Sequence, residues 1–328
     1  MLSPESDVIY YDPVIWPISL DRVPLTYSSL KAFSKLKEYD VIINYDLSPI
    51  TNLLLLLVSR LYKKRLILEV HDPYGLDRES GAASACRNSL VGAYGALRAS
   101  IILRMPNIRV INGSDYLFLK NRGYKGKIYF IPILVALARP KMKANRKEFV
   151  CLIAGRLSVR QKGLDYLKEI VDKALEKNNK IKFHIVGSGD DGKPLVRELV
   201  RAHKGNVRWF GFAPQRTLRS EYSNSTAFLL TSRFEGSPAA LVEAMSNGLV
   251  CVAFSIRGVV DTVRGIKKVR LVKPYDTDFF VDALLDLYSV WKHGGITTKM
   301  KYEISRATLR RYDYKKTLLQ IKKMVDGR

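Results

Sequence analysis

Short, continuous apolar runs alternate with amphipathic stretches along most of the chain. An apolar run of roughly four to eight residues is typical of a strand buried in a parallel sheet, and apolar positions three or four apart indicate a helix. The runs that predict strands are 8–11, 41–45, 66–70, 108–111, 128–131, 149–154, 181–186, 207–210, 227–230 and 250–254. The predicted helices are 25–39, 50–61, 82–103, 164–175, 217–223, 239–245 and 279–291. This alternation predicts an α/β protein with doubly wound parallel sheets.

A polar, basic stretch at 136–147 interrupts the alternation and predicts a linker between two domains. The first predicted domain is 1–138, a Rossmann-like N-terminal domain. The second is 147–298, also Rossmann-like. The remaining residues, 299–328, are rich in Lys and Arg with apolar positions at helical spacing, and predict one basic helix.

The composition fits two globular domains. The chain has 328 residues, of which 47% are hydrophobic, so it can fill two cores and is not a disordered chain. No apolar run approaches the roughly 20 residues that span a bilayer, and the first residues lack a signal-peptide pattern. Cys86, Cys151 and Cys251 are far apart and odd in number, which indicates core thiols without a disulfide or metal. We therefore expect a cytoplasmic protein.

The formal net charge of +24 is large and unevenly placed, with +6 in residues 1–140 and +18 in the rest. Such a field attracts anionic partners. Nucleotide sugars, an acidic membrane surface and nucleic acid all meet that description, and charge alone does not choose among them.

The best-defined candidate site is the turn Glu235-Gly236-Ser237, between a predicted strand and a helix that opens at Pro238. A helix N-terminus beside a glycine turn offers N–H groups to an anion. Carboxylates at Glu235 and, eight positions on, Glu243 can accept hydrogen bonds from hydroxyl groups. The combination suits a ligand that carries both phosphate and hydroxyls, although an ordinary strand–helix unit is the plainer interpretation.

This stretch resembles the Glu–seven residues–Glu signature, E-G-x-P-x-x-x-x-E, of the retaining glycosyltransferases of family 4. The fixed positions of the signature all match, and they are Glu235, Gly236, Pro238, Glu243, Ala244, Met245 and Gly248. The resemblance implies a GT-B fold, in which two Rossmann-like domains face a cleft and the last helix crosses back to the first domain. It also implies transfer of a sugar from a nucleotide-sugar donor with retention of anomeric configuration.

Two cations follow the strand at 149–154. Gly155-Arg156 and, six residues on, Lys162-Gly163 resemble the G-R-x(4–6)-K-G motif of the same family. Arg binds a pyrophosphate through a planar fork and Lys as a point charge, so Arg156 and Lys162 are predicted to bind the donor diphosphate. A basic surface loop is the alternative.

Three further residues enter through the resemblance. His71 follows the strand at 66–70, as does the family histidine that faces the donor sugar. Gly187 is the first glycine of a V-G-x-G that family members place near the nucleotide, and Phe212 follows a strand at the position that family members place near the base. A structural histidine, a weak Gly-x-Gly and a core aromatic are the respective alternatives.

Two features bear on the rest of the mechanism. Family members open with a glycine-rich loop that approaches the acceptor, and the first 45 residues show none, so the first βα units are expected to be reduced or missing. Asp276-Thr277-Asp278 precedes a helix and is predicted to cap it instead of holding a metal. We expect no cofactor and no metal, with cations and a helix N-terminus stabilising the leaving diphosphate.

The resulting hypothesis is a metal-independent hexosyltransferase with a lipid-linked or glycan acceptor. The basic tail indicates either a solvated helix face or contact with acidic lipids on the cytoplasmic face of a membrane. A nucleic-acid-directed protein and a catalytically silent sugar-nucleotide-binding protein remain as alternatives.

Overall fold

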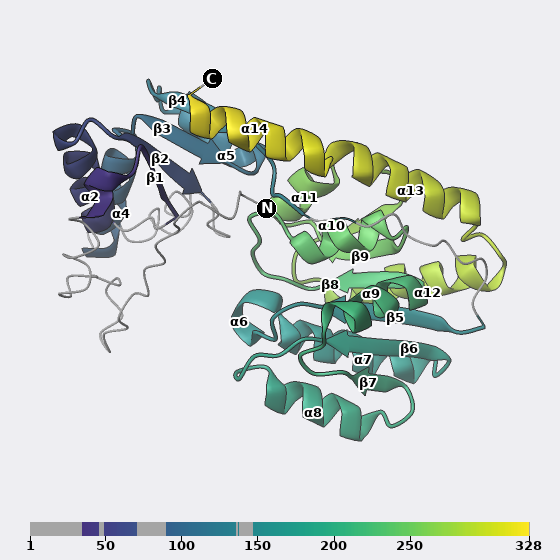
Figure 1. The fold of residues 1–328 in the computed structure, drawn as a ribbon. Coiled ribbons are helices and arrows are strands. Elements are labelled where there is room, and N and C mark those ends of the chain that lie inside the picture. Colours follow the sequence, from purple (N-terminus) through teal and green to yellow (C-terminus); the bar gives the residue numbers. More distant parts are fainter. Residues whose placement is uncertain (1–34, 46–48, 71–89, 136, 138–146, 328) are drawn as a thin grey trace. The chain divides into compact units, whose positions relative to one another are not determined.

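The protein, described by a computed structural model, contains two units, each with its own parallel sheet (Figure 1). Residues 35–45, 49–70, 90–135, 137 and 147–327 are described. Unit 1 comprises Met1–Ile131 and Lys323–Arg328, and unit 2 comprises Pro132–Lys322. Every pair among the described strands is parallel, which confirms the predicted fold class.

The described residues of unit 1 form a four-stranded sheet in the order β1-β2-β3-β4. Its strands are β1 (Val41–Asn44), β2 (Arg65–Val70), β3 (Asn107–Val110) and β4 (Lys127–Phe130), and its helical elements are η1 (Leu36–Glu38), α2 (Pro49–Leu61), α4 (Leu90–Ile102) and α5 (Gly113–Asn121). Neighbouring strands in this sheet are also consecutive along the chain. The described strands of unit 1 therefore contain no reversal of strand order. Leu66, Leu68, Ile108 and Val110 fill the core because β2 and β3 lie inside the sheet.

Unit 2 has a six-stranded sheet in the order β10-β9-β8-β5-β6-β7. Its strands are β5 (Phe149–Ala154), β6 (Ile181–Val186), β7 (Val207–Trp209), β8 (Ala227–Leu230), β9 (Val250–Phe254) and β10 (Val269–Val272). Its helices are α6 (Val159–Lys162), α7 (Leu164–Lys177), α8 (Lys193–Ala202), α9 (Gln215–Asn224), α10 (Ala239–Ser246), α11 (Arg257–Val263), α12 (Thr277–Lys292), α13 (Thr298–Arg311) and most of α14 (Tyr314–Asp326).

The core of unit 2 follows directly from the apolar runs. The largest fully buried side chains include Phe149, Phe183, Phe228 and Phe254, each from a different strand. Cys151 of β5 and Cys251 of β9 are buried free thiols, and burial raises the pKa of both well above the usual range. These two cysteines are core residues as predicted, while Cys86 lies outside the described residues.

The glycine in Arg257-Gly258 predicts a turn after the strand at 250–254, and this prediction is wrong, because both residues belong to helix α11. Gly258 is buried, and a Cβ added there would lie 1.9 Å from the carbonyl oxygen of Glu235. A glycine is required at position 258 because helix α11 packs closely against the backbone of Glu235 and Gly236.

The basic tail is two helices, α13 and α14, and not the single helix that was predicted. Asp313 separates them, since its side chain accepts from the Lys316 N–H at 2.8 Å and so caps the start of α14. The last residues, Lys323–Arg328, group with unit 1. Within that unit, Arg65 Nη1 of β2 donates to the carbonyl oxygen of Val325 at 3.1 Å.

Several predictions fall outside the described residues. These are His71, the strand at 8–11, residues 25–34 of a predicted helix, residues 82–89 of another, and nearly all of the linker at 136–147.

Candidate functional site

The strand order of unit 2 marks the edge where a ligand is expected. From β5 the chain proceeds through β6 to β7 on one side, and then returns to β8, β9 and β10 on the other. The order therefore reverses between β5 and β8. In open parallel sheets, ligands bind at such a reversal, outside the carboxyl ends of the strands. The loops that follow β5 and β8 are the elements to inspect.

Two predicted site residues meet there. Lys162 ends helix α6, which follows β5, and Glu235 lies in the turn after β8. Lys162 Nζ lies 2.6 Å from Glu235 Oε1. Ser232 Oγ donates to the same carboxylate oxygen at 2.7 Å. Glu235 is 8% exposed, so its carboxylate is held by a cation and a hydroxyl in a nearly buried position.

Sequence reasoning missed the residue that joins these two loops, Arg233. Its guanidinium makes a two-bond ion pair with Asp165 of α7, with Nη1 2.8 Å from Oδ1. Nη1 also donates to the carbonyl oxygen of Val159 at 2.7 Å, and the guanidinium carbon stands 4.2 Å from the centre of the Tyr166 ring. The only signal in the sequence was an Arg two positions before Glu235.

Two further hydrogen bonds, both accepted by backbone carbonyl groups, link the loops after β5 and β8. The Arg233 N–H donates to the Gln161 carbonyl oxygen at 2.9 Å, and Thr231 Oγ1 donates to that of Lys162, also at 2.9 Å. Helix α6, which carries Lys162, is thus fixed to the turn that carries Glu235. The cation and the carboxylate are held in place before any ligand arrives.

Replacing Arg233 with Gln is expected to reduce the free energy of unfolding by about 1 kcal/mol at pH 7, since the ion pair is two-pronged but partly exposed. The Arg233 hydrogen bond is the main cause that lowers the pKa of Asp165. A lowered carboxyl pKa stabilises the fold above the unfolded-state value of about 4, and that stabilisation is lost as the pH falls through the folded-state value. The difference between wild type and variant should therefore shrink below about pH 4.

Urea unfolding at pH 7 and pH 3 measures this difference. Lys177→Gln is the control, because Lys177 pairs with Asp282 at 3.4 Å and both side chains are largely exposed. It should cost at most about 0.5 kcal/mol. An equal loss for Arg233→Gln at both pH values would contradict the assigned ion pair.

Glu243 is engaged by a tyrosine. It lies on α10, and its Oε2 accepts from Tyr222 Oη of α9 at 2.8 Å. Burial, followed by the nearby Glu243 charge, raises the pKa of Tyr222 well above its usual value. Tyr222 therefore stays a hydrogen-bond donor and orients a carboxylate that has capacity for further donors. The hydroxyl oxygen of Ser237, before the same helix, lies 3.4 Å from that of Thr262.

The backbone of the loop after β6 packs closely against the backbone of the loop after β5. Gly187 has φ of +146°, and a Cβ added there would lie 1.8 Å from the carbonyl oxygen of Gly155. Trp209 Nε1 donates to the Gly187 carbonyl oxygen at 3.0 Å. The close packing against Gly155 thus requires a glycine at position 187, independently of any contact with a nucleotide.

Two predicted residues are on the surface of unit 2. Phe212 follows β7 and is 86% exposed, so it is not a core aromatic. Arg156 is also exposed, with Nη2 at 3.5 Å from Gln161 Oε1. The structure therefore brings Lys162 and Glu235 into contact but shows no direct contact of Arg156 or Phe212 with that pair.

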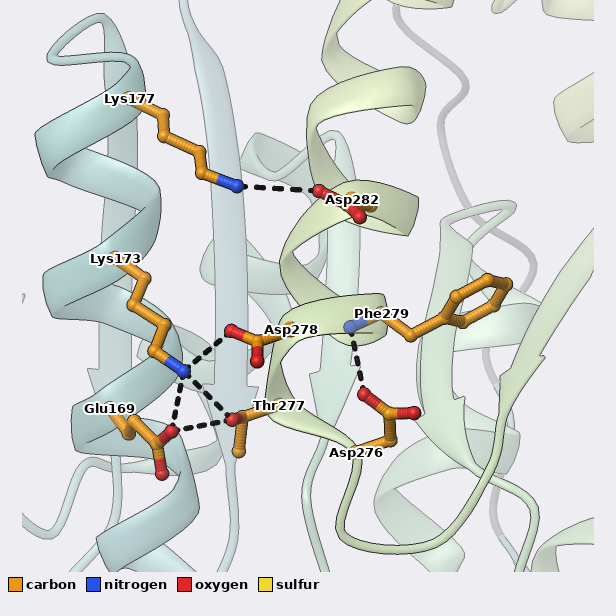
Figure 2. Close-up of polar contacts among 8 residues, drawn as sticks. All are labelled: Glu169, Lys173, Lys177, Asp276, Thr277, Asp278, Phe279 and Asp282. Carbon is orange, nitrogen blue, oxygen red and sulfur yellow. Dashed lines mark hydrogen bonds and ion pairs between the residues drawn. The ribbon is translucent and has the colours of Figure 1, made fainter.

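The Asp276-Thr277-Asp278 stretch caps a helix, as predicted (Figure 2). Asp276 Oδ1 accepts from the Phe279 N–H at 3.0 Å, and Asp278 pairs at 2.6 Å with Lys173 of α7. Figure 2 shows both carboxylates at the start of α12, with Asp278 turned toward α7. In the described part of the chain, no group of three His, Cys, Asp or Glu side chains could hold a metal ion.

The comparisons with known proteins point to the same half of the chain. Residues 148–289 match the family model described as "Glycosyl transferases group 1", which is less than half of the chain. The Salmonella typhimurium lipopolysaccharide 1,6-galactosyltransferase is 33% identical over 144 residues, which cover 42% of this chain and 39% of that protein. A glycogen synthase from Elusimicrobium minutum is 30% identical over 122 residues, 37% of this chain and 24% of that protein. The matched region thus spans well under half of these relatives.

Solved structures resemble a larger part of the chain. A mutant of S. aureus TarM, in complex with fondaparinux, α-GlcNAc-glycerol and UDP, has a TM-score of 0.70 at 18% identity, over 89% of this chain and 58% of that chain. Sucrose-phosphate synthase from Thermosynechococcus elongatus has a TM-score of 0.73 at 17% identity, over 92% and 76%. At these identities the likeness establishes the fold, and it confirms the predicted GT-B class.

Proposed function

We propose that this chain is a glycosyltransferase that moves a sugar from a nucleotide-sugar donor to an acceptor. The observation that carries the proposal is the Lys162–Glu235 pair at the reversal of strand order. Both residues lie inside the segment that matches the group 1 glycosyltransferase model. A cation and a carboxylate side by side suit the two parts of such a donor, its diphosphate and its sugar hydroxyls.

The diphosphate is assigned to Lys162 and Arg156, assisted by the backbone N–H groups of Gly236 and Ser237 beside the start of α10. On binding, Lys162 exchanges part of its contact with Glu235 for a phosphate oxygen. Charge developing on the leaving diphosphate is then stabilised by groups already in position, without a metal ion.

The sugar and the nucleoside are assigned to other residues. Glu235 accepts from sugar hydroxyls, and Glu243, oriented by Tyr222, accepts from the ribose hydroxyls. Gly187 and Phe212 lie near the nucleotide in this proposal, and His71 contacts the sugar near the bond that breaks. Transfer of a hexose with retention of anomeric configuration follows from the family 4 resemblance.

The acceptor is proposed to be a lipid-linked or glycan molecule at the cytoplasmic face of a membrane. The partial match to a lipopolysaccharide galactosyltransferase favours this kind of acceptor. Among the described residues, no helix has the length and apolar character to cross a bilayer. Association with the membrane is therefore proposed to be peripheral.

A panel of nucleotide sugars tests the function. A true donor present at 100 times its Kd should stabilise unit 2 by about 2.7 kcal/mol, which a thermal unfolding scan detects. The bound donor is then assayed for release of the nucleoside diphosphate, with and without glycan and lipid-linked acceptors.

Three results can be told apart. Binding followed by turnover supports the proposal. Binding without turnover for any acceptor favours the silent sugar-nucleotide-binding protein. No stabilisation by any nucleotide sugar, with the protein shown to be folded, would contradict the donor site itself.

A further inference from the structure

Helix α2 buries Leu55 and Leu56 in the core of unit 1 and exposes further apolar residues on another face. Its buried positions include the polar residues Thr51, Asn52 and Ser59. Its exposed positions carry large apolar side chains, and these are Ile50, Leu53, Leu57 and Leu61. The helix, near the purple end of the colour scale in Figure 1, packs against α4 and β2.

The exposed residues form one stripe. Their spacing of three, four and four residues places them on one face of a helix. Leu57 is 54% exposed, Leu61 is 73% exposed, and Tyr62 extends the stripe beyond the helix end. A row of this kind marks an interaction surface more often than a scatter of single apolar residues does.

The segment that carries the stripe, residues 49–65, has charged residues of a single sign. Residues 49–65 contain no Asp or Glu, and their cations are Arg60, Lys63, Lys64 and Arg65. Lys64 Nζ lies 3.9 Å from Asp40 Oδ1, and Arg65 Nη2 donates a hydrogen bond to Tyr129 Oη. Arg60 and Lys63 are exposed and stand at the end of the stripe. A partner for this face must therefore be both apolar and anionic.

We propose that this face of α2 docks on the surface of an acidic lipid bilayer. The helix has 13 residues and is about 20 Å long at 1.5 Å per residue, too short to cross a hydrocarbon core of about 30 Å. It lies in the plane of the interface, with the leucines at the acyl boundary and Arg60 and Lys63 among the headgroups. The docking does not require the proposed glycosyl transfer, and only its purpose, access to a lipid-linked acceptor, rests on that function.

A second copy of the chain fits this face less well. In a symmetric dimer the same patch lies on both sides of the interface, so residues 49–65 would offer no carboxylate to Arg60 and Lys63 on a chain of net charge +24. An acidic bilayer satisfies the stripe and the cations together.

The test is co-sedimentation of the full chain with vesicles of phosphatidylcholine, alone or with phosphatidylglycerol. Binding is expected on the mixed vesicles and should weaken with added salt. Leu53→Gln/Leu57→Gln should lower the partition coefficient on mixed vesicles by about tenfold or more. Arg60→Gln/Lys63→Gln should lower it by about 25-fold, at about fivefold per cation, with little change on neutral vesicles.

Leu319→Gln is the matched control. Leu319 lies on the basic helix α14 and is 53% exposed, close to the value for Leu57. Binding should be unchanged in this variant. Loss of binding here, with no effect of the α2 changes, would assign the docking to the tail and overturn the proposal.

Three other results would overturn the proposed docking of α2 on a bilayer. No binding of wild type to acidic vesicles overturns it, as does a dimer in light scattering that the leucine changes dissociate. A leucine double variant that no longer unfolds cooperatively would show that the stripe is covered by this chain itself. Thermal stabilisation of the α2 variants by the donor should match wild type, so a failed docking test and a failed donor site are distinguishable.

Discussion

Replacing Lys162 with Met is expected to lower turnover of the donor by about 10²–10³-fold. Loss of a group that stabilises charge developing in the transition state has an effect of this size. The same change leaves the nearly buried Glu235 carboxylate without its cation, so the free energy of unfolding should fall by about 3 kcal/mol. Steady-state kinetics and urea unfolding measure the two effects separately.

The double variant Lys162→Met/Glu235→Gln separates structure from chemistry. The glutamine that replaces Glu235 carries no charge, so stability should recover by most of the amount lost in the single variant. Turnover should not recover, because neither the diphosphate cation nor the carboxylate that accepts from the sugar is restored. Recovery of turnover together with stability would mean that Lys162 serves only as a counter-ion to Glu235.

Lys173→Met provides the control for loss of a paired lysine. Lys173 lies 2.6 Å from both Glu169 and Asp278, on the surface between α7 and α12 (Figure 2). Exposed pairs of this kind contribute at most about 1 kcal/mol, and this one lies away from the loops after β5 and β8. Turnover should stay within about twofold of wild type.

Most strands were predictable because they are short, separate apolar runs, and β8 and β9 are buried along their whole length. β5, β6, β8 and β9 all lie where the pattern placed them. β10 was missed, since Val269–Val272 includes a partly exposed Arg270 between apolar residues. Helix α11 was missed for a different reason, because a glycine near its start resembles a turn signal until the neighbouring backbone is known.

Motifs singled out residues of the candidate site one at a time, but they did not predict which of these residues are in contact. The motifs singled out Lys162 and Glu235, which are 73 residues apart in the chain. Their contact depends on β8 lying beside β5, and strand order is a property of the whole sheet that no local pattern encodes. The Arg233–Asp165 pair was missed because it depends on the same adjacency. Its residues carried no motif of their own.

Gly258→Ala is expected to displace the turn that carries Glu235, although Gly258 itself is not assigned a contact with the donor. The added Cβ would lie 1.9 Å from the Glu235 carbonyl oxygen and 2.8 Å from that of Gly236, so backbone must move. Such overpacking should cost about 2 kcal/mol of folding stability. A displacement of about 1 Å at a reacting group can cost about 10²-fold in rate, so turnover should fall by about that factor. Thermal unfolding and donor kinetics on the same preparation measure both.

Gly205→Ala is the control because it separates backbone strain from contact with the site. Gly205 has φ of +84° and open space where its Cβ would stand. It lies before the amino end of β7, whereas the Glu235 turn follows the carboxyl end of β8. The alanine should cost about 1 kcal/mol through its backbone conformation alone. Turnover at a temperature where both variants are folded should then equal wild type for Gly205→Ala and remain low for Gly258→Ala. Equal activities in the two variants would show that α11 does not position the Glu235 turn.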